Sequence, residues 1–167
     1  MNRWIKPIFY FYMLSLFVSC GYQFAGMGKM PGGAKTVFVT MLKNNSNETG
    51  LERIITNSII NEFSRSGITM IKDQTRADAV LSGVVSSVYT ETIARSSTNT
   101  SSERRVYTRL DMKLTDNKGK VLWARSGLEE SEAYLTGTDE DRQRSQAIEE
   151  LVKRLSRTVY QRLTDDF

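Results

Sequence analysis

Apolar and polar side chains alternate with period two between positions 104 and 115. One side of this segment holds Val106, Thr108, Leu110, Met112 and Leu114. The other side holds Arg105, Tyr107, Arg109, Asp111 and Lys113. This pattern predicts a β-strand with one buried face and one exposed face. The turn-forming residues 116–119 and the β-rich segment 120–131 predict that the chain then folds back as a hairpin.

Two other segments repeat apolar residues every three or four positions, which indicates amphipathic helices. The first is predicted to begin at Thr49, with Glu52 completing a capping box, and to end at Gly67. Its apolar stripe is Leu51, Ile54, Ile55, Ile59 and Phe63. The second is predicted to begin at Thr138, and its stripe is Ile148, Leu151, Val152, Leu155, Val159 and Leu163. We expect the two stripes to pack together against the sheet.

Three further segments, 35–42, 68–71 and 79–92, have the composition of strands. In the last of them, strict alternation would place Tyr89 on the same side as Leu81 and Val85. The resulting order, β-α-β-β-β-β-α, predicts an α+β fold in a single domain, residues 35–167. We expect a two-layer sandwich: a mainly antiparallel sheet of four to five strands, with both amphipathic helices on one face. The other face must then meet water or a partner.

The N-terminal residues have the pattern of an export signal. Arg3 and Lys6 precede an apolar run at 7–18, which is too short to span a bilayer as a helix. Residues 1–19 are therefore predicted to be a signal peptide that is removed before the single cysteine, Cys20. The glycine-rich segment that follows, up to residue 34, is predicted to be an irregular tether.

The sequence Leu16-Phe17-Val18-Ser19-Cys20 resembles the lipobox of bacterial lipoproteins, although Phe17 stands where that motif usually has leucine. The resemblance implies that Cys20 becomes the first mature residue and carries acyl chains, which would hold the protein on a membrane. It also implies the outer membrane, because Gly21 stands where inner-membrane lipoproteins have aspartate.

The composition excludes several classes of function. The chain has no histidine and one cysteine, which excludes histidine-based catalytic triads, intramolecular disulfides and most zinc sites. The sequence contains no nucleophile elbow and no phosphate-binding loop. The net charge of +4 is too small for a typical nucleic-acid-binding protein. We therefore expect a binding or structural protein, not an enzyme, with no cofactor, no metal and no nucleic-acid partner.

Five features occur in an order that resembles a known family. They are Cys20 followed by residues 21–24, the strand 36–40, the segment 77–83, the hairpin 114–123 and the closing amphipathic helix. Their order and the short chain resemble the LPS-assembly lipoprotein LptE family over residues 20–163. The resemblance implies an outer-membrane lipoprotein that plugs the lumen of the LptD β-barrel and binds lipopolysaccharide through basic residues. Together the two proteins would place lipopolysaccharide in the outer leaflet.

A second resemblance leaves another function open. Residues 77–83, with the sequence Ala-Asp-Ala-Val-Leu-Ser-Gly, also resemble a stretch of penicillin-binding-protein activators and of curli-secretion lipoproteins. Membership of those families would make the protein a regulator of peptidoglycan synthesis or part of a secretion pore. The short tether between Cys20 and the first strand favours instead a protein that is held close to its membrane.

The charged side of segment 104–115 is the predicted binding face. Arg105, Arg109 and Lys113 lie on one side of the strand, while Arg104, Lys118 and Lys120 lie near its two ends. Arginine and lysine pair well with phosphates, which lipid A carries, so we predict that these six residues contact lipopolysaccharide or the barrel. The alternative is a solvated strand face whose charges keep other strands from pairing with it. The residues alone favour neither the binding face nor the solvated face, and the family resemblance favours the binding face.

Overall fold

The computed structural model describes residues 30–95 and 102–165 of the chain. A mixed sheet forms the centre of the molecule. The strands are β1 (Thr36–Val39), β2 (Lys43–Asn44), β3 (Thr69–Met70), β4 (Ala79–Arg95), β5 (Ser102–Asp116) and β6 (Val121–Leu135). Their order is β3-β1-β4-β5-β6, with β2 also paired to β4. The long strands β4, β5 and β6 pair antiparallel, whereas the short strands β1, β2 and β3 pair parallel to their neighbours.

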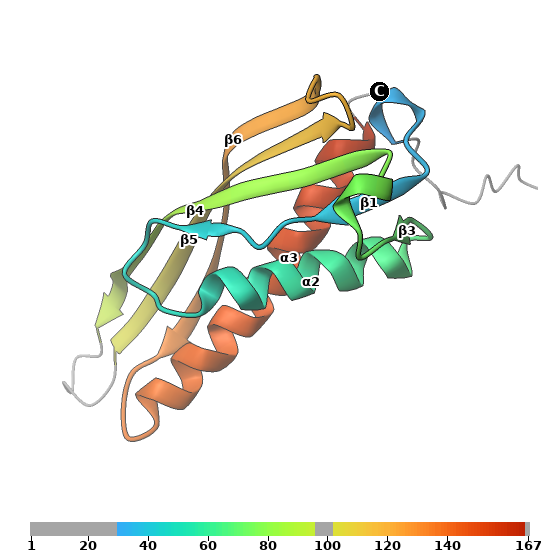
Figure 1. The fold of residues 1–167 in the computed structure, drawn as a ribbon. Helices are drawn as coiled ribbons and strands as arrows, with labels where there is room; N and C mark the ends of the chain where they lie inside the picture. The colour runs from blue at the N-terminus through green and yellow to red at the C-terminus, as the bar shows by residue number, and fades with distance from the viewer. Residues whose placement is uncertain (1–29, 96–101, 166–167) are drawn as a thin grey trace, which may run out of the picture.

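Two helices cover one face of this sheet (Figure 1). They are α2 (Leu51–Arg65) and α3 (Glu140–Asp165), and two short 3-10 turns, η1 (Pro31–Gly33) and η2 (Gln74–Arg76), complete the fold. The predicted α+β sandwich is confirmed. The segment 35–42, expected as one strand, ends as β1 at Val39, and β2 follows as a second short strand farther along β4.

The helices run in the same direction along the sheet. At their N-terminal ends, Arg144 of α3 donates a 3.0 Å hydrogen bond to Glu48, just before α2. At their C-terminal ends, the rings of Phe63 and Tyr160 meet edge to face at 5.7 Å. Between these contacts the apolar stripes pack into one core with the inner face of the sheet. Its fully buried larger side chains include Leu51, Ile55, Ile59, Phe63, Leu81, Leu110, Leu114, Leu151, Leu155 and Leu163.

The start of α2 differs from the predicted capping box. The helix begins after Gly50, whose φ of 87° lies in the left-handed region that favours glycine, and no side chain caps its N-terminus. Glu52 instead accepts a 2.7 Å hydrogen bond from the side chain of Asn44. Ile54, predicted on the buried stripe, is 47% exposed. The Thr49–Glu52 prediction was wrong because the chain enters the helix through a glycine turn that side-chain spacing does not reveal.

A β-bulge in β4 changes which side chains face the core. The register with β5 shifts between Val85 and Ser87, so that one extra residue is inserted. Before the bulge Leu81 and Val85 are buried, and after it Val88 packs against the core. Tyr89 therefore lies on the opposite face, where its ring stacks on Tyr107 with centroids 4.8 Å apart. The prediction that Tyr89 shares a side with Leu81 was wrong because strict alternation does not survive a bulge.

Candidate partner-binding face

The sheet face without helices, here called the outer face, carries the predicted polar side of β5. The five apolar-side positions of β5, from Val106 to Leu114, are buried. Because successive side chains of a strand point to opposite faces, Arg105, Tyr107, Arg109, Asp111 and Lys113 lie on the outer face. This part of the prediction is confirmed as geometry, and the binding role of these residues stays a prediction.

Carboxylates interleave with the cations of the outer face. Arg109 donates two hydrogen bonds to Glu129 of β6, at 2.7 and 3.1 Å. Glu91 of β4 lies directly opposite Arg105 in the strand register. Lys113, in contrast, is exposed and makes no ion pair with any residue in the described ranges. Arg109 is therefore balanced locally, whereas Lys113 and Arg105 make no ion pair within the described residues and are available to an anionic partner.

Asp111 joins the three long strands. Its carboxylate accepts hydrogen bonds from the hydroxyl of Ser86, at the bulge of β4, and from the backbone N–H of Gly127 in β6, at 2.8 Å. Gly127 has a φ of 69° and sits where the register between β5 and β6 also shifts. Both hydrogen bonds lower the pKa of the Asp111 carboxyl, and the bond from Ser86 has the larger effect. Asp111 thus holds two bulges in place and is not available as a ligand-binding group.

An aromatic pair lies beside Arg105 on the outer face. The rings of Tyr89 and Tyr107 are nearly parallel, with an angle of 6° between their planes. Tyr89 is 38% exposed, and Arg105 is only half-buried although its Nε atom is enclosed and has no hydrogen-bond partner among the described residues. The face can therefore offer a flat apolar surface next to a guanidinium group.

The remaining three predicted site residues lie elsewhere. Arg104 points to the helix side of the sheet, where its guanidinium bonds Glu140 of α3 at 2.8 Å. Lys118 and Lys120 sit on the turn between β5 and β6, where their backbone N–H groups donate to Asp116 at 2.8 Å. Arg105 and Lys113 are eight positions apart in β5, which is about 26 Å along a strand. Of the six predicted residues, three thus lie on the outer face, two lie on the β5–β6 turn, and Arg104 lies on the helix side.

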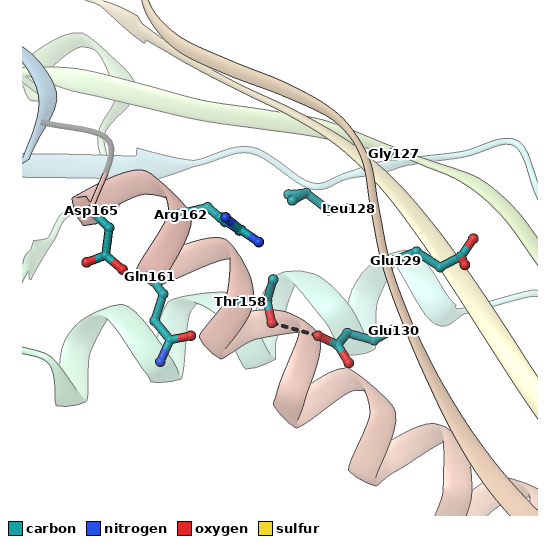
Figure 2. Close-up of a pocket in the computed structure, with 8 residues that line it drawn as sticks. All are labelled: Gly127, Leu128, Glu129, Glu130, Thr158, Gln161, Arg162 and Asp165. Carbon is teal, nitrogen blue, oxygen red and sulfur yellow. Dashed lines mark hydrogen bonds between the residues drawn. The ribbon is translucent and has the colours of Figure 1, made fainter.

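A pocket of about 440 Å³ opens between β6 and the C-terminal half of α3 (Figure 2). In it, Thr158 of α3 donates a 2.7 Å hydrogen bond to Glu130 of β6, and Arg162 lines the wall nearby. Arg154 of α3 also pairs with Glu130 and with Glu132. Sequence patterns could not predict this pocket because its two sides lie about thirty positions apart. The pairing of Glu130 inside the fold indicates a structural contact between strand and helix.

Two classes of site are not found in the described ranges. No group of three or more acidic, cysteine or histidine side chains within residues 30–95 and 102–165 could hold a metal ion. No helix in these ranges is long and apolar enough to cross a membrane. Cys20 lies outside the described residues.

Comparison with solved structures finds other proteins with this fold. A minor lipoprotein from Acinetobacter baumannii superposes with a TM-score of 0.55 at 12% identity, covering 79% of this chain and 94% of that one. The hypothetical protein CT253 from Chlamydia trachomatis gives a TM-score of 0.54 at 9% identity, covering 77% and 95%. At such identities the likeness shows the fold alone.

Comparison of sequences identifies the family. No curated protein matches the chain. The sequence profile of the family described as LptE, lipopolysaccharide-assembly, matches residues 34–163. This range begins just before β1 and ends in the last turn of α3, so it contains the sheet and both helices. The chain therefore belongs to the LptE lipopolysaccharide-assembly family, a family of non-enzymatic lipoproteins.

Proposed function

We propose that the protein is an outer-membrane lipoprotein that acts with an LptD β-barrel, as its plug and lipopolysaccharide-binding subunit, in lipopolysaccharide transport. Membership of the LptE family carries this proposal, because the family profile covers the whole sheet and both helices. The outer face supports it, since no helix in the described part of the chain covers this side of the sheet, which carries Arg105, Lys113 and a stacked tyrosine pair. A barrel wall or a lipid A headgroup would cover such a face.

The lipid anchor is the first part of this proposal that can be tested. Intact mass spectrometry of protein purified from membranes is expected to show a chain that begins at Cys20 and carries additional acyl mass. Cys20→Ser should keep residues 1–19 and lack that mass, because the thiol that accepts the diacylglycerol is gone. A wild-type chain that is uncleaved, or that begins at Cys20 without acyl mass, would show that the protein is held at the membrane in another way.

Charge reversal on the outer face tests the contact surface. Arg105→Glu combined with Lys113→Glu is expected to weaken both lipopolysaccharide binding and co-purification with the barrel. Each lost charge-assisted contact costs about 1.5–3 kcal/mol, or roughly tenfold or more in affinity. Arg109 is left unchanged because it already donates two hydrogen bonds to Glu129. Affinity is measured at low and moderate salt, since exposed pairs are screened.

A matched control places the same change on the helix layer. Arg53 and Arg142 are both exposed, and Arg53→Glu with Arg142→Glu alters the net charge by the same amount. Thermal unfolding first establishes that both double variants are folded. If the outer-face variant binds lipopolysaccharide and the barrel as well as the control variant does, the outer face is not the contact surface.

A further inference from the structure

The second half of β4 forms an open edge of the sheet. The strands β1 and β2 pair with β4 only as far as Val85, and no other strand of the described chain lies beside the residues that follow. β4 continues past the end of β2 to Arg95 (Figure 1). Residues 89–94 are all exposed. Because neighbouring side chains of a strand point to opposite faces, this part of β4 is open on both faces as well as along its edge.

The backbone groups of three residues point out of this edge. In an antiparallel pair, every second residue directs its N–H and C=O away from the partner strand. Val85 is such a residue, because its carbonyl accepts a 2.9 Å hydrogen bond from the N–H of Asn45 on the side away from β5. Counted from Val85 across the bulge, whose inserted residue leaves the alternation unchanged, Val88, Thr90 and Thr92 also point away from β5.

The far end of the strand pair gives the same assignment. There the carbonyl of Ser102 accepts a 2.8 Å hydrogen bond from the N–H of Thr136, so it points away from β4. The three outward N–H groups and three outward carbonyls bond no residue in the ranges 30–95 and 102–165. Groups that repeat in this way along a strand are matched by the backbone of another strand. The edge therefore specifies an extended polypeptide as its ligand.

This edge lacks the features that usually prevent strands from pairing. Natural edge strands carry charges, prolines or bulges, or are very short. At the other side of the sheet, β3 has two residues, and β6 is interrupted by a bulge at Gly127 and carries Arg125, Glu129, Glu130 and Glu132. The segment 87–92 of β4 runs without interruption between two bulges, and Glu91 is its only charged residue. Its other residues are mostly β-branched or aromatic, which favours strand pairing.

Tyr89 joins this edge to the outer face, because its ring stacks on Tyr107. A protein that covers the outer face therefore also reaches the edge of β4. In the proposed function that protein is the β-barrel. Strands in the wall of a closed barrel are already paired on both sides, so the wall itself has no free strand to add. The occupant must be a segment of the barrel protein that extends from the wall into the lumen.

We propose that an extended segment of the barrel protein adds to the sheet as a strand along residues 87–92. Its backbone pairs with the outward N–H and C=O groups of Val88, Thr90 and Thr92. On the outer face an apolar side chain of the segment packs against the ring of Tyr89, which is 38% exposed. On the opposite face the threonines favour β-branched or hydroxyl side chains as neighbours. This inference rests on the proposed function and specifies how the partner is held.

Amide hydrogen exchange tests the proposal on the wild-type chain. The full, membrane-extracted protein is compared in detergent in two forms, produced without the barrel and co-purified with it. We expect the amides of Val88, Thr90 and Thr92 to exchange at least about tenfold more slowly in the complex, because a bonded N–H exchanges only when its bond opens. The amides of Tyr89 and Glu91 point toward β5 and should exchange slowly in both samples, which makes them internal controls.

Thr90→Pro tests the same contact by mutation. Because the N–H of Thr90 points out of the edge, proline removes no bond to β5, but its ring blocks an added strand. The amount of barrel recovered per lipoprotein should fall at least about tenfold. Thr138→Pro is the matched control, since Thr138 is exposed before α3 and its N–H bonds no residue of the described chain. Thermal unfolding first establishes that both variants are folded, and recovery with Thr138→Pro should equal that of the wild type.

The outcomes separate this inference from the proposed function. If the barrel co-purifies but the three outward amides exchange as fast as in the free chain, no strand adds to β4, although the proposed function stands. The same holds if Thr90→Pro recovers as much barrel as Thr138→Pro. Slow exchange of these amides in the free chain also overturns the inference, because the chain would then cover its own edge. If no barrel co-purifies with the wild type, both proposals fail. The exchange result decides alone if Thr90→Pro does not fold.

Discussion

Replacing Phe63 with alanine is expected to lower the free energy of unfolding by about 3–5 kcal/mol. The ring is completely buried and lies in the last turn of α2, where it contacts Tyr160 of α3. Its removal costs the transfer free energy of the ring and leaves a cavity between helices and sheet, because a packed core collapses only in part. Guanidinium denaturation should show a lower midpoint with an unchanged slope.

Ile54→Ala is the matched control for this prediction. Ile54 lies on the same helix and is also apolar, but its 47% exposure means that little apolar surface is lost when it is shortened. Its cost should remain below about 1 kcal/mol. A Phe63→Ala cost as small as that of Ile54→Ala would contradict the packing of α2 against α3.

The second large effect is expected from Gly83→Ala, which should destabilise the fold by about 1–3 kcal/mol. A Cβ atom at this position would lie 2.8 Å from the backbone oxygen of Asp111 and closer still to the sulfur of Met112. Met112 is 2% exposed and cannot swing into solvent, and the Asp111 oxygen belongs to the paired strand. The added methyl group must therefore push β4 and β5 apart, which thermal or denaturant unfolding would detect.

Two further variants test whether the contact with Met112 causes the loss of stability in Gly83→Ala. Ser82→Ala changes the adjacent residue, whose side chain lies on the other face, and should shift stability by about 0.5 kcal/mol or less. Combining Gly83→Ala with Met112→Ala should cost less than the sum of the single changes, because the new methyl group occupies space that the sulfur leaves. Strict additivity would show that contact with Met112 is not what limits the size of residue 83.

The contacts of segment 77–83 have a structural role. Asp78 accepts hydrogen bonds from the backbone N–H groups of Lys35 and Thr36, each at 2.9 Å. Its own N–H donates to the hydroxyl of Thr36, so β1 is fixed to the start of β4. Leu81 is buried, and Gly83 fills a position with no room for a side chain. The segment builds the fold and does not distinguish a barrel partner from a synthase or a pore.

The sequence predicted those elements whose periodicity reports burial directly. In β5 every second residue from Val106 to Leu114 is buried, and the stripe of α3 is buried from Ile148 to Leu163. Both patterns arise because a regular element that packs on one side repeats its apolar residues with its own geometric period. The fold class and the outer-face positions of β5 followed from these two elements.

Irregular and non-local features could not be predicted in this way. The bulge near Ser86 moves Tyr89 to the outer face, and the local composition does not indicate that a residue is inserted there. Alternation from Val106 places Arg104 on the helix side of the sheet, but its partner Glu140, 36 positions away, could not be predicted. A groove between α2 and α3 joins residues about ninety positions apart, so only the packing of the helices reveals it.

The parallel pairing of β1 with β4 has a consequence for how the chain folds. The strands β4, β5 and β6 are consecutive and antiparallel, so their contacts close short loops at little entropic cost. The bonds between Asp78 and the start of β1 instead span more than forty positions, and the bond between Glu48 and Arg144 spans 96. Contacts between residues so far apart in the sequence form late in folding. The three-stranded meander should therefore act as the folding template, and the N-terminal strands and α2 should complete the native state by docking onto it.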